Sequence, residues 1–226
     1  MNTLPVSTFE IKYSKTNHPI PVINGVHLHS VYNPIKEAET FISKQEKILK
    51  EKNHILFLGL GFGHHIDQAI FLLRKFHGDN YQIVVIEPNL MTVENYYRFT
   101  NQTDPNIKIF SHTLPEGLFQ DRALVHFLLK GPGIIPHPAS FNLYQQYFKA
   151  FMGHKAPKNI SSLVTSLKCQ ELKNYLERFP GEQTLEILAN ETLVKNQELG
   201  ELDFLLLGFY KMVSYKKPER KTEVTA

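Results

Sequence analysis

Residues 53–66 read NHILFLGLGFGHHI, and this pattern predicts a buried strand, a glycine-rich turn and the start of a helix. Residues 55–58 are a short apolar run, which is typical of a parallel strand covered on both faces. Gly59, Gly61 and Gly63 follow at alternate positions, where the lack of a side chain lets the backbone turn sharply and another group come close. A helix that begins after such a turn presents free N–H groups and a partial positive charge, which suit a phosphate or a carboxylate.

The stretch that follows supports a nucleotide-binding type of fold. Residues 81–86 predict a second buried strand, and Glu87 stands at its end. In dinucleotide-binding units an acidic residue at this place accepts hydrogen bonds from ribose hydroxyls, and we expect its carboxylate to be solvated. We therefore expect a Rossmann-like (methyltransferase-like) α/β fold, with a mostly parallel sheet and helices on both faces. The predicted contacts to a nucleotide or S-adenosylmethionine are Gly59, Gly61, Gly63 and Glu87; a tight turn that holds no ligand is the alternative.

The composition favours a protein with a sizeable core and no affinity for nucleic acid or membranes. Apolar residues make up 42% of the chain, and 25 basic residues nearly balance 22 acidic ones, for a formal charge of +3. The single cysteine, Cys169, excludes an internal disulfide and suits a reducing compartment. The first residues lack the basic flank and apolar core of a signal peptide, and no apolar run reaches the roughly 20 residues of a membrane helix. We expect a cytoplasmic protein.

A small β element is predicted at the start of the chain, in residues 1–32. Asn24-Gly25 lies between two short apolar stretches and predicts a hairpin, because a type I′ turn needs positive φ at both central residues. We expect this element to pack on the main domain, since two or three short strands are unstable alone. His29, Ser30 and Tyr32 follow, and they form either a ligand wall that faces the glycine turn or a hydrogen-bonded join between the hairpin and the next helix.

The main domain is predicted to span residues 33–155. Residues 107–110 predict a third strand and residues 124–129 a fourth. Because the carboxyl ends of parallel strands share one edge of a sheet, His112 should lie on the same rim as the glycine turn, and it is a further candidate for ligand contact. The helix expected at about 142–151 carries aromatic residues at helical spacing, which we interpret as core.

Residues 156–215 predict a helical segment, and residues 216–226 predict a charged, disordered tail. One helix is expected over about 160–179, where apolar residues recur three and four positions apart, and two more near 183–196 and 201–215. The last of them has more apolar surface than an exposed helix tolerates. We therefore expect residues 201–215 to pack back on the domain, or to contact a second copy or a protein partner.

The chain carries no local motif of a familiar catalytic or metal site. It has 11 histidines but neither the His-Glu-x-x-His pattern nor a cysteine pair, and the adjacent His64 and His65 point apart in a helix. We therefore expect no metal site, and no catalytic residue is assigned. Methyl transfer from S-adenosylmethionine is the enzymatic alternative, although Phe57 stands where such enzymes usually carry an acid and Lys130-Gly131-Pro132 stands where their catalytic motif is expected.

Four stretches together resemble one protein family. His-Ser-x-Tyr-x-Pro-x-x-Glu-Ala begins at His29, Gly-Leu-Gly-Phe-Gly-His-His at Gly59 and Val-Ile-Glu-Pro at Val85, and a His-Pro segment follows at residues 137–138. In this order they resemble the N-terminal domain of the motility-associated factor (Maf) family, over about residues 7–155. The resemblance implies a Rossmann-like domain that precedes a catalytic domain implicated in adding nonulosonic acid sugars to flagellin. We find no Gly-x-Gly-Pro-Ser-Leu type of motif, which marks that catalytic domain, so we expect an accessory role in surface-glycan or flagellin modification and no stand-alone glycosyl transfer.

Overall fold

The computed structural model describes residues 8–100, 104–155, 159–194 and 198–214. The chain divides into two compact units, Met1–His154 and Lys155–Ala226. Within the described ranges, no helix is both long enough and apolar enough to cross a membrane.

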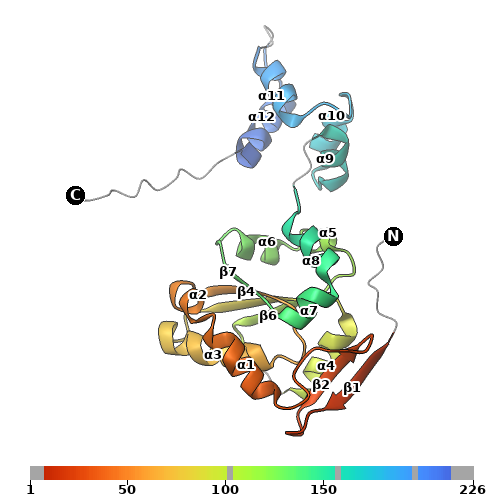
Figure 1. Ribbon diagram of the computed structural model, residues 1–226. Helices are drawn as coiled ribbons and strands as arrows, with labels where there is room; N and C mark the ends of the chain where they lie inside the picture. Colours follow the sequence, from red (N-terminus) through yellow and green to blue (C-terminus); the bar gives the residue numbers. More distant parts are fainter. Residues whose placement is uncertain (1–7, 101–103, 156–158, 195–197, 215–226) are drawn as a thin grey trace, which may run out of the picture. The chain divides into compact units, whose positions relative to one another are not determined.

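The first unit is built around a four-stranded parallel sheet (Figure 1). Its strands are β4 (His54–Leu58), β5 (Gln82–Ile86), β6 (Ile107–Phe110) and β7 (Gly133–Pro136), in the order β6-β5-β4-β7, and every neighbouring pair is parallel. The chain moves outward from β4 through β5 to β6 and then returns to add β7 on the other side of β4. The strand order thus reverses between β4 and β7, and in open α/β sheets the crevice beyond the carboxyl ends at such a point is the usual ligand site.

Helices cover both faces of this sheet, which confirms the predicted Rossmann-like α/β fold. The helices are α1 (Pro34–Ser43), α2 (Glu46–Glu51), α3 (His64–His77), α4 (Leu90–Phe99), α5 (Pro115–Leu118), α6 (Arg122–Leu128), α7 (Pro138–Leu143) and α8 (Gln145–Met152). Alternate residues of β4 point to opposite faces. Ile55 and Phe57 share a buried cluster with residues of α1–α4, whereas Leu56 and Leu58 share another with residues of α5, α6 and α8. The aromatic residues of the 142–151 stretch belong to the second cluster, so their interpretation as core is confirmed.

The small β element at the start has the predicted hairpin. It consists of β1 (Phe9–Tyr13), β2 (Pro19–Ile23) and β3 (Val26–His27), which form an antiparallel sheet. Asn24 and Gly25 have φ values of 52° and 77°, as a type I′ turn requires. Ile23 and Leu28 lie in the same buried cluster as the second face of the main sheet.

The fourth strand was wrongly predicted. Residues 124–129 are not a strand: α6 occupies Arg122–Leu128, and the fourth strand is β7. The side chain of Asp121 accepts hydrogen bonds from the N–H groups of Ala123 and Leu124 and so caps the helix. Leu124 and Phe127 are buried one helical turn apart, while Leu129 is 81% exposed, so the apolar run has one buried helical face.

The second unit is helical. It contains α9 (Ile160–Ser166), α10 (Gln170–Leu176), α11 (Leu185–Val194) and α12 (Glu201–Ser214), which share one apolar cluster. The single helix expected over 160–179 is broken, because Leu167 is extended and ends α9. Leu206 of α12 is fully buried, whereas Phe204 is 62% exposed. The predicted tail, 216–226, lies outside the described residues.

Candidate functional site

The glycine turn between β4 and α3 is buried, and its donors are used within the protein. Gly59, Gly61 and Gly63 all have positive φ, at 103°, 51° and 77°. The N–H groups of Leu60 and Gly61 donate to the carboxylate of Glu87, with a distance of 2.9 Å from Leu60 N to Oε2. The turn therefore forms as predicted, but these two N–H groups already have an acceptor.

Glu87 is fully buried, so the expectation that its carboxylate is solvated was wrong. Its second oxygen, Oε1, accepts from the N–H of Asn89 at 3.0 Å. Burial raises the pKa of Glu87 to about 7, and the backbone N–H groups act in the opposite direction. Glu87 thus holds the turn through its backbone N–H groups, and because its side chain is fully buried a ribose could reach it only if the surrounding residues moved. Its contact with a ligand stays a prediction.

The three glycines make room for the protein's own side chains. A Cβ atom at Gly59 would overlap Ser140, one at Gly61 would overlap the ring of His29, and one at Gly63 would overlap the ring of Tyr96. The need for glycine at these positions is therefore explained by packing within the chain. This geometry favours the tight-turn interpretation of the turn itself.

His29 lies directly on the glycine turn, and the residues after it hold it there. Its Nε2 accepts the N–H of Phe62 at 2.8 Å, and its Nδ1 lies 3.9 Å from Oε2 of Glu37. The N–H of Ser30 donates to the same Glu37 oxygen at 2.7 Å, while the Ser30 hydroxyl accepts from the N–H of Tyr32. His29 thus faces the turn as predicted, and Ser30 forms the predicted hydrogen-bonded join.

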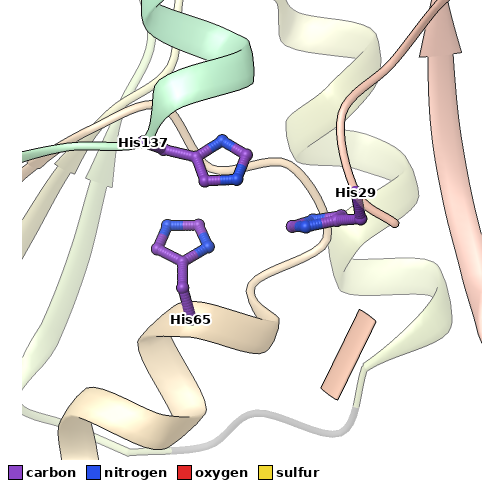
Figure 2. Close-up of side chains that lie close together, drawn as sticks. All are labelled: His29, His65 and His137. Atoms are coloured by element: carbon purple, nitrogen blue, oxygen red, sulfur yellow. The ribbon is translucent and has the colours of Figure 1, made fainter. Parts of the chain in front are cut away.

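Three histidines from distant parts of the chain meet near the starts of α3 and α7, beyond the carboxyl ends of β4 and β7 (Figure 2). His29 follows β3, His65 lies in the first turn of α3, and His137 directly follows β7. Each offers a ring nitrogen within 4.8 Å of the others, and all three side chains are buried. The rings of His65 and His137 are stacked, with centroids 4.4 Å apart and planes 7° apart, and the His29 ring lies 5.0 Å from that of His137.

These histidines are neutral at physiological pH. Burial, together with the neighbouring histidines, lowers the pKa of His29 and His65 well below the ordinary value. The same causes lower the pKa of His137 to about 4. A neutral imidazole has one lone pair free on a ring nitrogen, so the cluster presents acceptors and not charges.

A cavity of about 150 Å³ opens onto this cluster. Its lining residues are Leu28, His29, Glu37, Ala38, Phe41, His65, His137, Pro138 and Ala139. It shares Glu37 and Phe41 with a more open groove of about 460 Å³ along α1. The groove is lined by Ser30, Tyr32, Asn33, Lys36, Glu37, Thr40, Phe41 and Lys44. Because His65 follows β4 and His137 follows β7, the cavity lies where the strand order reverses.

Two of the predicted site residues, Tyr32 and His112, lie outside the cavity next to the three histidines. The ring of Tyr32 is 62% exposed at the groove, with the ammonium group of Lys15 4.4 Å from its centroid. His112 is held on the β6 side of the rim: its Nδ1 accepts the N–H of Leu114, and its backbone oxygen accepts the hydroxyl of Tyr147. The proposed contact of His112 with a ligand stays a prediction.

Comparison with known proteins does not assign this chain to a family. No protein-family model matches the chain, and no curated protein matches it. Among solved structures, MnmC2 from Aquifex aeolicus is 16% identical, with a TM-score of 0.36, over 53% of this chain and 48% of that one.

Two spermidine synthases of known structure are also similar to this chain. One, in complex with the transition-state analogue AdoDATO, is 14% identical over 53% of this chain and 41% of that one, and the other, from Thermotoga maritima, is 10% identical over 64% and 59%. Both have a TM-score of 0.40. The chain therefore spans between 41% and 59% of the length of these three structures, and the likeness concerns the fold alone.

Proposed function

We propose that the first unit binds a small molecule of the nucleotide or S-adenosylmethionine type in the groove along α1, with one end of the ligand in the cavity above β4 and β7. The observation that supports the proposal is the position of this cavity, at the reversal of strand order and beside the groove, with which it shares Glu37 and Phe41. Ligand pockets commonly measure about 300–1,000 Å³. The groove, at about 460 Å³, is in that range, whereas the cavity alone, at about 150 Å³, takes only a small group.

The side chains of the groove fit such a ligand. The exposed ring of Tyr32 offers a face on which a base can stack, and Lys36 and Lys44 offer ammonium groups for phosphates. Ser30 lines the same groove, and His29 lines the cavity. The glycine turn shapes the site by placing His29 and His65, since Glu87 and His29 already hold its N–H groups.

We further propose that this unit has an accessory role in surface-glycan or flagellin modification. The stretches that resemble the Maf N-terminal domain support this, because their residues meet at one place in the fold. His29, Gly61 and Glu87 come from three of these stretches and are linked through the glycine turn, and His137, from the fourth, packs beside His29. Residues of α12 would then provide the contact to a second copy or a partner protein.

The experiment is a binding panel measured by thermal shift and calorimetry on the full chain. It includes adenosine, uridine and cytidine nucleotides, S-adenosylmethionine and a CMP-activated nonulosonic acid. At about 100 times its dissociation constant, a ligand adds about 2.7 kcal/mol to the stability of the folded protein. We expect one of these to raise the melting temperature, and a flat response to all of them at millimolar concentration would refute the proposal.

A pair of tyrosine variants places the ligand. Tyr32→Ala should weaken binding about 5- to 150-fold, because stacking of a base on an aromatic ring contributes about 1–3 kcal/mol. Tyr13→Ala is the matched control, since Tyr13 is 60% exposed on β1 and Tyr32 is 62% exposed. Equal affinity of the two variants would exclude Tyr32 as the base platform.

A further inference from the structure

We propose that His29, His65 and His137 bind one divalent transition-metal ion, and that this ion is Zn²⁺. One coordination position is open and faces the cavity. Imidazole nitrogen is a preferred ligand of such ions. Three protein ligands with a fourth position left for water or another small group is the arrangement of reactive zinc sites. The proposal goes beyond the binding role above and does not depend on it.

One atom of the cluster points directly to a ligand. Nδ1 of His65 is buried and has no hydrogen-bond partner among the described residues. Its other ring nitrogen, Nε2, lies 3.3 Å from the carbonyl oxygen of Gly59. A neutral imidazole that donates from Nε2 carries its lone pair on Nδ1. A buried acceptor without a donor is costly, and a metal ion would satisfy it.

The other two rings have a similar arrangement of partners. Nδ1 of His137 lies 2.8 Å from the hydroxyl of Ser140, and Nδ1 of His29 lies 3.9 Å from the carboxylate of Glu37. Each ring thus has a protein group near one nitrogen: a carbonyl within hydrogen-bond distance for His65, a hydroxyl within hydrogen-bond distance for His137, and for His29 a carboxylate that must approach from 3.9 Å to accept its N–H. Metal-bound histidines almost always donate their second N–H to groups of this kind, which fix the tautomer and the ring orientation. The remaining nitrogens are Nδ1 of His65 and Nε2 of His29 and His137.

Binding requires two local changes. Nε2 of His29 accepts the N–H of Phe62, and it must release that bond in order to ligate a metal. The stacked rings of His65 and His137 must also tilt, because a metal lies near the plane of each imidazole that binds it and two parallel planes do not meet. Metal binding is therefore coupled to the glycine turn, and the amide of Phe62 should report it. Since burial lowers the pKa of all three histidines, no proton has to leave them at neutral pH.

The test is a zinc titration of the full chain, without a histidine tag, after treatment with a chelator. We expect one equivalent of Zn²⁺ to bind, a rise in melting temperature, and a Co²⁺ form with visible absorption. His65→Ala and His137→Ala should each lower the affinity at least about 100-fold, the upper end of what the loss of an outer partner costs. His27→Ala is the control for surface histidines, because His27 is exposed on β3, and it should bind like the wild type.

Glu37→Gln keeps the proposal testable if the histidine variants do not fold. The Glu37 side chain is 46% exposed, and the amide oxygen of a glutamine can still accept the N–H of Ser30, so the melting temperature of the metal-free protein should change little. Because Glu37 orients His29, the affinity for zinc should fall about 10- to 100-fold. The proposal is overturned if zinc leaves the wild-type melting temperature unchanged, or if His27→Ala weakens binding as much as Glu37→Gln does. The titration contains no nucleotide, so its failure leaves the ligand proposed for the groove untouched.

Discussion

Replacing Glu87 should strongly destabilise the first unit. The carboxylate is fully buried and accepts the backbone N–H groups of Leu60, Gly61 and Asn89. A buried donor left without an acceptor costs about 1–3 kcal/mol. Water that enters the space of the missing side chain satisfies part of this demand, so we expect Glu87→Ala to lower the free energy of unfolding by about 3–5 kcal/mol. At about 2–4 °C per kcal/mol, the melting temperature should fall by about 6–20 °C.

The assay is differential scanning calorimetry of the full chain, with Glu94→Ala as the control. Glu94 is exposed on α4, and a surface substitution of this kind changes stability by no more than about 0.5 kcal/mol. If Glu87→Ala melts at the same temperature as Glu94→Ala, the carboxylate does not brace the turn. A ribose contact would then again be the better explanation for Glu87.

The pH dependence of stability gives a second measure of the same group. Burial raises the pKa of Glu87 from 4.5 to about 7, so its contribution to stability increases as pH falls from 7 to 4.5. Burial lowers the pKa of His137 from 6.5 to about 4, so its contribution is lost as pH falls through that window, and His29 and His65 act in the same direction. The two effects oppose each other. Glu87→Gln removes the proton uptake by Glu87 that offsets the effect of the histidines. The melting temperature of this variant should therefore fall more steeply than that of the wild type between pH 6.5 and 4.5. Parallel curves of melting temperature against pH for the two proteins would contradict this.

Three further substitutions test single features. Gly61→Ala should cost about 2–3 kcal/mol in denaturant unfolding, because it strains the backbone and displaces His29. Gly25→Ala, in the hairpin turn, meets only open space and should cost about 1–2 kcal/mol; equal losses would contradict the close packing of His29. Asp121→Ala should cost about 1 kcal/mol as the loss of the α6 cap, and no change in unfolding would count against the helix. If the exposed Phe204 on α12 contacts a second copy of the chain, Phe204→Glu should convert a dimer to a monomer in sedimentation velocity. A monomeric wild type would contradict this contact.

The strands that could be predicted are those whose pattern is local. β4, β5 and β6 are short, mostly apolar stretches bounded by turn residues, and all three lie where the sequence places them. β7 was missed because it contains a glycine and a proline, which are unusual in the centre of a sheet. β7 lies at the edge of the sheet. Proline has no N–H to donate, and an edge strand tolerates this because no further strand pairs with its outer side. The run at 124–129 lacks an alternating pattern, and the cap at Asp121 was the signal that could have identified a helix.

The site was predictable in place but not in detail. Strand, turn and acidic residue together locate the rim, and the structure does bring Glu87 to the glycine turn. Whether that carboxylate faces solvent or backbone depends on the packing above it, which no local pattern records. The histidine cluster depends on topology in the same way, because His29, His65 and His137 become neighbours only when β7 pairs with β4 and the segment after β3 crosses the turn.

The proposed ligand lies along α1 and enters the cavity, whereas the sequence pattern predicts a ligand on the glycine turn and Glu87. The most direct measurement is a ¹H–¹⁵N spectrum of the labelled chain, titrated with the tightest ligand of the panel. We expect the largest shifts at the amides of residues 30–44, with a smaller change at His137 and little at Leu60 and Asn89, whose N–H groups stay bonded to Glu87. Shifts centred on Leu60, Gly61 and Asn89, with residues 30–44 unchanged, would contradict this placement of the ligand.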